Sequence, residues 1–277
     1  MDTDQARATH LPTRGNLAPA YVLSLIIAIL TATASAIGLL SRATIYPTEN
    51  LIEGFVANDV VTLALGLPIL LGSMWLAGRG RLIGLLFWPG ALLYGLYNSI
   101  AYVFGLPLNV VFVLHLALVA LSTYATIGLV AAIDAEAVKE RLAGAVPERG
   151  AGGILAGLGL LFCLLAGGTV VGALVEGTPI SEATLAVHVA DLLIVPAWVI
   201  GGMLLWRCRP MGYVAGLGLL FQGSMLFVGL IVVLLLQPVL VEGTLALSDV
   251  VAVAIMGLIC FIPFGLFVRG VALARRS

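Results

Sequence analysis

Two aspartates, Asp59 and Asp191, lie inside long apolar stretches of the sequence. Charged side chains are costly within a lipid bilayer and usually have a function there. His188 precedes Asp191 by three residues, so the two side chains share one face of a helix and could form a pair. Carboxylates in this setting can bind a cation, carry a proton or act as an acid–base dyad.

Other polar residues fall at a similar depth in the predicted spans. A helix rises about 1.5 Å per residue, so counting from the predicted cytoplasmic end of each span places these residues near the outer edge of the hydrocarbon. The candidate ligand-binding residues are therefore Asp59, Asp191, His188, Asn58, Asn98, His115 and Tyr97. Each of these residues could instead form a structural hydrogen bond between helices, and this alternative is favoured for Asn98 and His115. Asn109 and Ser248-Asp249 are typical of helix caps.

The composition indicates a membrane protein. Of the 277 residues, 61% are apolar and 10% are charged, and the mean hydropathy is +1.17. A soluble domain is about 45–50% apolar and about 25% charged, so soluble, disordered and nucleic-acid-binding proteins are excluded. The single lysine, Lys139, lies in a polar stretch, which excludes an intramembrane retinal Schiff base. Cys163, Cys208 and Cys260 form no disulfide framework.

The apolar stretches predict an all-α protein with eight transmembrane helices. A hydrocarbon core of about 30 Å needs about 20 apolar residues per helix. The predicted spans are residues 17–40, 55–77, 82–104, 109–133, 153–175, 185–206, 211–236 and 249–271. The first span has features of a signal peptide, but its apolar run is longer than such a segment, so we expect a retained helix. Pro68, Pro89, Pro196 and Pro263 are expected to kink their spans.

Basic residues predict the orientation in the plasma (inner) membrane. If both termini and the even-numbered loops are cytoplasmic, Arg42 is the one basic residue on the outer side. Loops rich in Lys and Arg stay on the cytoplasmic side. The twelve residues on that side are Arg7, Arg14, Arg79, Arg81, Lys139, Arg141, Arg149, Arg207, Arg209, Arg269, Arg275 and Arg276.

The two halves of the chain resemble each other. Residues 47–59 align with 179–191 at an offset of 132, and Pro68, Arg81 and Gly84 align with residues of the same type at an offset of 128. Four spans per half would insert both copies in the same orientation, related by a pseudo-twofold axis along the membrane normal. The predicted regions are an N-terminal tail (1–16), a first repeat (17–133), a linker (134–152), a second repeat (153–271) and a C-terminal tail (272–277).

The charge distribution predicts an acidic, polar pocket that faces outward above a mostly apolar inner half. The outer side has a net charge of −7 and the cytoplasmic side +6. Such a field attracts cations and repels anions. The outer acidic residues are Glu49, Glu53, Asp59, Glu176, Glu182, Asp191, Glu242 and Asp249.

Four functions are compatible with these features. The favoured one is binding or transport of a small cation or neutral solute by Asp59 and Asp191. The second is an enzyme at the outer face, although HExxH, GxGD and DDxxD motifs are absent from the sequence. The third is haem or metal binding by His115 and His188, and the fourth is a non-catalytic subunit or assembly factor. We expect no cofactor, and partners limited to lipid, a solute and other membrane chains, including copies of itself.

Overall fold

The computed structural model describes residues 11–240, 245 and 247–274. Within these residues all regular elements are helical, apart from one isolated β-bridge between Thr13 and Ile133. Parts of the two expected tails, with Arg7, Arg275 and Arg276, lie outside the described residues, as does Glu242. The elements are α2 (Ala18–Leu40), α3 (Arg42–Ile45), α4 (Glu49–Leu51), η1 (Ile52–Val56), α5 (Ala57–Val61), η2 (Thr62–Gly66), α6 (Leu67–Gly78), α7 (Leu82–Gly105), α8 (Val110–Ala132), α9 (Ala135–Leu142), α10 (Glu148–Glu176), α11 (Glu182–Ile194), α12 (Pro196–Trp206), α13 (Pro210–Leu240) and α14 (Leu247–Leu273).

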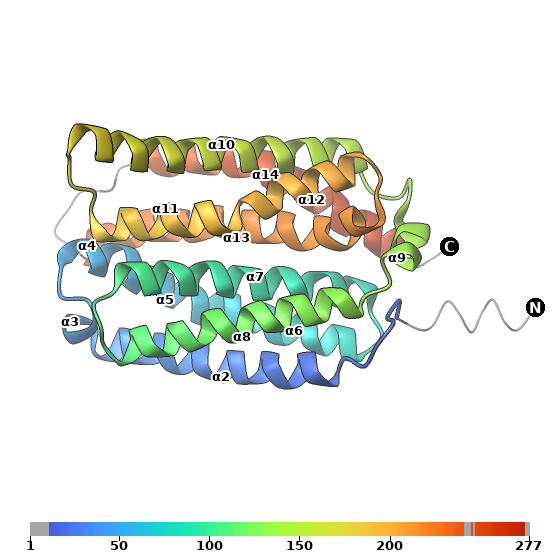
Figure 1. The fold of residues 1–277 in the computed structure, drawn as a ribbon, viewed down its shortest axis with the longest axis horizontal. Helices are drawn as coiled ribbons and strands as arrows, with labels where there is room; N and C mark the ends of the chain where they lie inside the picture. The colour runs from blue at the N-terminus through green and yellow to red at the C-terminus, as the bar shows by residue number, and fades with distance from the viewer. Residues whose placement is uncertain (1–10, 241–244, 246, 275–277) are drawn as a thin grey trace, which may run out of the picture.

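The described residues contain eight helical segments that are long and apolar enough to cross a membrane, which confirms the predicted spans. Their long axes run side by side, and the start of α2 and the end of α14 lie at the same end of the bundle (Figure 1). The second segment joins α4 through α6, and the sixth joins α11 and α12. The chain is therefore a multi-pass helical membrane protein.

Helices α7 and α13 form the centre of the bundle. Within an apolar segment of 18 residues, 78% of the residues of α7 and 50% of those of α13 are buried. In α2, α8, α10 and α14 the buried share lies between 22% and 33%. The two central helices approach closely at Gly90 and Gly218, where a Cβ added to Gly90 would lie 2.5 Å from the Gly218 Cα. Since a side chain would not fit there, glycine allows the two backbones to touch.

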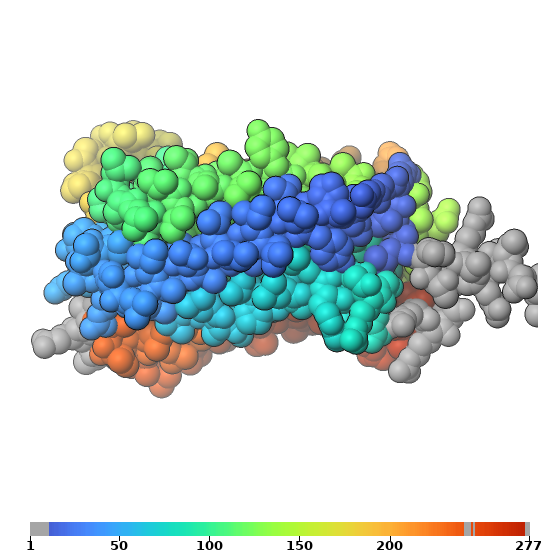
Figure 2. Space-filling model, turned by 90° about the horizontal axis from the view of Figure 1, so that it is seen from below, coloured from blue at the N-terminus to red at the C-terminus, as the bar shows by residue number. Residues whose placement is uncertain are grey.

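The outer helices present apolar side chains to the surroundings. Figure 2 shows α2 and α8 next to each other on one face of the molecule. On α2, the side chains of Val22, Leu25 and Ile29 are each more than half exposed. Exposed aliphatic residues along a whole helix are suited to contact with lipid tails.

Two spans are interrupted in their middle near Pro68 and Pro196, whereas Pro89 and Pro263 lie inside the unbroken helices α7 and α14. In the second span, two π-helical segments, η1 and η2, flank α5, which carries Asp59. Pro68 follows η2 and has no N–H to donate to the carbonyl of Ala64, which accounts for the widened turn. In the sixth span, α11 ends at Ile194 and α12 begins at Pro196, because Pro196 also has no backbone N–H to continue the helical hydrogen bonds.

The polar stretch 134–152 is more ordered than the predicted linker suggests. It contains α9, whose Val138 and Leu142 are buried, and α10 begins within it at Glu148. Asp134 caps α9 and accepts a hydrogen bond of 2.8 Å from Arg14. This hydrogen bond raises the pKa of Arg14 and lowers that of Asp134. The segment before α2 is thereby attached to the end of α8.

Candidate functional site

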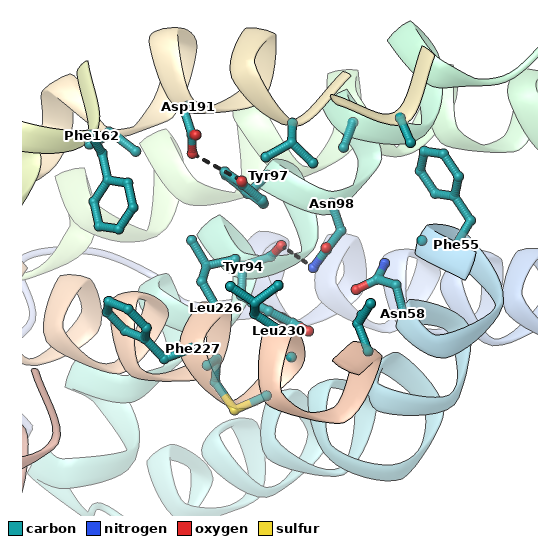
Figure 3. Close-up of a pocket in the computed structure, with 18 of the residues that line it drawn as sticks. Phe55, Asn58, Tyr94, Tyr97, Asn98, Phe162, Asp191, Leu226, Phe227 and Leu230 are labelled. Atoms are coloured by element: carbon teal, nitrogen blue, oxygen red, sulfur yellow. Dashed lines mark hydrogen bonds between the residues drawn. The ribbon is translucent and has the colours of Figure 1, made fainter. Parts of the chain in front are cut away.

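A cavity of about 260 Å³ lies between the two halves of the chain, within the membrane-spanning helices. Its wall combines residues from the second span, α7, α10, α11, α12 and α13 (Figure 3). The polar or charged members are Asn58, Tyr94, Tyr97, Asn98 and Asp191. The apolar and aromatic members are Gly54, Phe55, Ala101, Phe162, Ala183, Val187, Val195, Trp198, Met225, Leu226, Phe227, Gly229, Leu230 and Val233.

Asp191 places a carboxylate on the wall of this cavity. It lies three turns into α11, whose N-cap is Ser181, so it cannot cap the helix itself. Its Oδ1 accepts a hydrogen bond of 3.0 Å from the Tyr97 hydroxyl, the single hydrogen bond to this carboxylate among the described residues. Its Oδ2 lies 3.9 Å from Nδ1 of His188, beyond hydrogen-bond distance. One carboxylate oxygen thus remains available for a ligand.

Asp59 is enclosed and does not line the cavity. Its side chain is fully buried, and it accepts hydrogen bonds of 2.5 Å from Tyr46 and 2.7 Å from Tyr102. Gly38 of α2 packs against the same carboxylate, since an added Cβ would overlap it. Burial and the nearby Asp59 raise the pKa of Tyr46, so its hydroxyl remains a donor.

The prediction that both aspartates face one acidic pocket is therefore wrong. Tyr46, Tyr102 and Gly38 pack around Asp59, and Asp59 is not among the residues that line the cavity. Among the described residues on the cavity wall, Asp191 is the one charged side chain, and most of the others are apolar. The cavity is thus a mostly hydrophobic space with one acidic group.

His115 belongs to the Asp59 cluster and not to the cavity wall. Its ring stacks on Tyr102 with 4.0 Å between the ring centres, and its Nδ1 lies 3.3 Å from the Ser99 hydroxyl. Nε2 is buried and has no hydrogen-bond partner within the described chain. A second cavity of about 30 Å³ adjoins His115, Ser99 and Asn98. This space is large enough for a water molecule, and its wall combines polar side chains such as Ser35 and Thr62 with Ile27, Leu67, Leu70 and Leu92.

The remaining candidates divide between the cavity and its surroundings. Asn58 lines the cavity and donates a hydrogen bond of 3.3 Å to Tyr102. Asn98 lines both cavities and donates one of 2.9 Å to the Tyr94 carbonyl. Four of the seven predicted residues thus meet at the large cavity: Asp191, Tyr97, Asn58 and Asn98. His188 lies on the same helix as Asp191 but is not part of the wall.

Sequence reasoning missed the aromatic side of the cavity. Phe162, Trp198 and Phe227 come from three different spans and line the same cavity. Figure 3 shows two of them, Phe162 and Phe227. Aromatic residues are common in membrane helices, so no local signal separates these three from the rest. The cap predicted at Asn109 is confirmed by a hydrogen bond of 2.9 Å that it accepts from the Phe112 N–H. The cap predicted at Ser248-Asp249 is wrong, because α14 already begins at Leu247 and both residues lie in its first turn.

A metal centre has no support from the arrangement of ligands. In the described part of the chain, no three His, Cys, Asp or Glu residues lie close enough together to hold a metal ion. The two histidines considered for haem have different surroundings, since His115 packs on Tyr102 and His188 lies beside Asp191. The chemistry offered by the cavity is therefore that of a carboxylate, two amides and aromatic rings.

The chain matches no protein-family model, no curated protein and no solved structure.

Proposed function

We propose that this multi-pass membrane protein binds a small solute in the cavity between its two halves, with Asp191 as the polar anchor. The observation that carries the proposal is a carboxylate that has one hydrogen bond and borders an intramembrane cavity of about 260 Å³. Ligand sites are concave and mostly apolar, with a few polar groups that fix orientation. Tyr97, Asn58 and Asn98 are the other polar groups assigned to the site.

Transport is the role that we assign to this binding site. Residues 17–133 and 153–271 would form two parallel repeats joined by the linker 134–152, and transporters place substrate between such repeats. The contact between Gly90 and Gly218 supports this symmetry, because these residues are related by the offset of 128 and meet at the centre. The clustering of Lys and Arg supports a plasma (inner) membrane location with both termini cytoplasmic.

Equivalent glycines elsewhere support the repeat further. An added Cβ on Gly84 would overlap the backbone of the preceding helix at Leu76 and Ala77. On Gly212 it would overlap Leu204 and Leu205, which lie at the same offset from that pair. The turn between the second and third spans is thus built like the turn between the sixth and seventh.

Ligand binding is tested by thermal unfolding of the purified full-length protein in nanodiscs, with a panel of small cationic, neutral and anionic aromatic compounds. Because a ligand stabilises the state that it binds, an occupant of the cavity should raise the unfolding temperature. Ala101→Phe, which fills the cavity, is the matched variant and should abolish the shift. If no compound raises the unfolding temperature of the wild type more than that of Ala101→Phe, the proposal is wrong.

Transport is tested separately with any compound that passes the first assay. Proteoliposomes should take up the labelled compound faster than protein-free liposomes, and Ala101→Phe should remove the difference. Binding without uptake would retain the binding site and reject the transport role.

A further inference from the structure

We propose that the cavity selects lipophilic organic cations, with the cationic nitrogen at Asp191 and the hydrocarbon part among Phe162, Trp198 and Phe227. This inference rests on the proposed function and specifies the chemical class of its ligand. It follows from the charge, the hydrogen bonding and the shape of the cavity wall.

The charge of the wall requires a cation or a neutral group at Asp191. No Lys or Arg stands among the described residues of the cavity wall, and the basic side chain beside Asp191 is His188, 3.9 Å away, which is a cation only when protonated. An unpaired carboxylate in a low-dielectric environment is costly, and a ligand cation would remove that cost. An anion would be repelled by Asp191, and the carboxylate of an amino acid or other zwitterion would find no partner on the wall.

The hydrogen bonds at Asp191 leave room for one polar contact. Tyr97 occupies Oδ1, while Oδ2 is 3.9 Å from the nearest nitrogen of His188. One N–H of the Asn58 amide is donated to Tyr102 and one N–H of the Asn98 amide to the Tyr94 carbonyl, so each amide keeps a second N–H and its oxygen. Most of the remaining wall is apolar or aromatic, so a sugar or another ligand with many hydroxyl groups would find too few partners on it.

The aromatic rings suit the apolar part of a cation. Phe162 lies 6.0 Å from both Trp198 and Phe227, measured between ring centres, and Asp191 borders the same space (Figure 3). The Trp198 ring is held in place by a hydrogen bond of 3.1 Å from its Nε1 to Gln222. Aromatic faces attract ammonium groups and also bury hydrocarbon.

A bare inorganic cation fits this wall less well. Hard cations such as Ca²⁺ need about six to eight oxygen ligands. The described wall offers oxygen atoms from five polar or charged side chains, and these alternate with apolar residues from five spans. The cavity of about 260 Å³ is instead of a size suited to a small organic molecule.

The test compares benzyltrimethylammonium with neopentylbenzene, an uncharged molecule of the same shape in which carbon replaces nitrogen, and with benzenesulfonate as the anion. Dissociation constants are measured by thermal unfolding of the full-length protein in nanodiscs, with Ala101→Phe as the reference for partition into lipid. The wild type should bind the cation about tenfold more tightly than the neutral molecule. Benzenesulfonate should not bind.

Asp191→Asn should reduce this preference to within about twofold, because the paired charge is removed. Glu182→Gln is the matched control, since it removes an exposed carboxylate from the same helix and should leave the preference unchanged. The comparison of the three compounds on the wild type does not depend on whether Asp191→Asn folds.

Equal or tighter binding of neopentylbenzene, or a preference that persists in Asp191→Asn, overturns the assignment of a cation while leaving a solute-binding cavity. If none of the three compounds binds, lipophilic organic cations are also excluded as the ligand class. The proposed binding function is then tested by the wider panel of small compounds.

Discussion

Asp59 and Asp191 occupy corresponding places in the two halves of the sequence, yet their surroundings differ. Asp59 is fully buried and accepts hydrogen bonds from Tyr46 and Tyr102. Asp191 is 8% exposed, accepts one from Tyr97, and borders the cavity. A buried carboxylate with several donors stabilises the surrounding helices, whereas one with a single donor can still accept a ligand.

The central helix α7 donates to both carboxylates, and Tyr46 is a second donor to Asp59 alone. This helix supplies both tyrosines, Tyr102 to Asp59 and Tyr97 to Asp191. At the offset of 128, the corresponding residues of α13 are Leu230 and Met225, which have no hydroxyl group. Both of these residues line the cavity. At these positions α13 thus offers no hydroxyl group to Asp191, whereas Asp59 accepts hydrogen bonds from both Tyr46 and Tyr102.

Removal of the carboxylates is expected to give the largest difference in the free energy of unfolding between the two sites. Asp59→Ala should lower the free energy of unfolding by about 2 kcal/mol, because Tyr46 loses its buried acceptor and a void forms. Asp191→Ala should cost only about 0.5 kcal/mol, since the Tyr97 hydroxyl faces a cavity that water can enter. Unfolding in mixtures of detergent and sodium dodecyl sulfate measures both. Equal losses would remove the distinction between the two sites.

The access of a thiol reagent to the cavity wall and to the Asp59 cluster provides a second measure of the difference between the two sites. In a variant without the natural cysteines, Ala101→Cys on the cavity wall should react with a small methanethiosulfonate reagent about tenfold faster than Ala57→Cys. Ala57 is the control because it is fully buried beside the Asp59 cluster. Mass spectrometry gives the two rates. Faster modification at position 57 would show that the cluster is open.

Removal of single hydroxyl groups should give a smaller difference with the same sign. Tyr102→Phe should reduce the free energy of unfolding by about 1 kcal/mol, and Tyr97→Phe by about half as much. Tyr102 contributes more because its hydroxyl also lies 3.1 Å from the Phe55 carbonyl and 3.3 Å from the Asn58 amide. The reverse order in the same unfolding assay would contradict this interpretation.

The smallest effect concerns Asp134, an acidic residue outside the spans that serves as a reference for the two buried ones. The hydrogen bond from Arg14 lowers the pKa of Asp134 below its ordinary value of 3.8. The bond therefore stabilises the folded state above pH 3.8, and this contribution is lost as the pH falls through the lowered pKa. Hydrogen exchange at the Asp134 amide should increase over that range.

Asp134→Asn is the control for this measurement. It removes the ion pair, so exchange at this position should no longer respond to acid in the same way. An unchanged response in Asp134→Asn would assign the effect to another group.

Sequence alone was enough to predict the eight spans, the interruptions at Pro68 and Pro196, and the cap at Asn109. It also predicted kinks at Pro89 and Pro263, where the helices are unbroken. These features depend on hydropathy over about 20 residues, on a missing N–H or on a side chain close to its own helix end, and all of these are local. The orientation and the repeat remain predictions of the same kind.

The packing of the helices was needed to learn that Asp59 is enclosed, that Asp191 borders a cavity and that this cavity is mostly hydrophobic. The donors to the two carboxylates lie far from them in the chain, since Tyr102 is 43 residues from Asp59 and Tyr97 is 94 residues from Asp191. Phe162, Trp198 and Phe227 likewise meet from three spans. Such contacts depend on how the helices rotate and pack against one another, and residue order and hydropathy do not specify this.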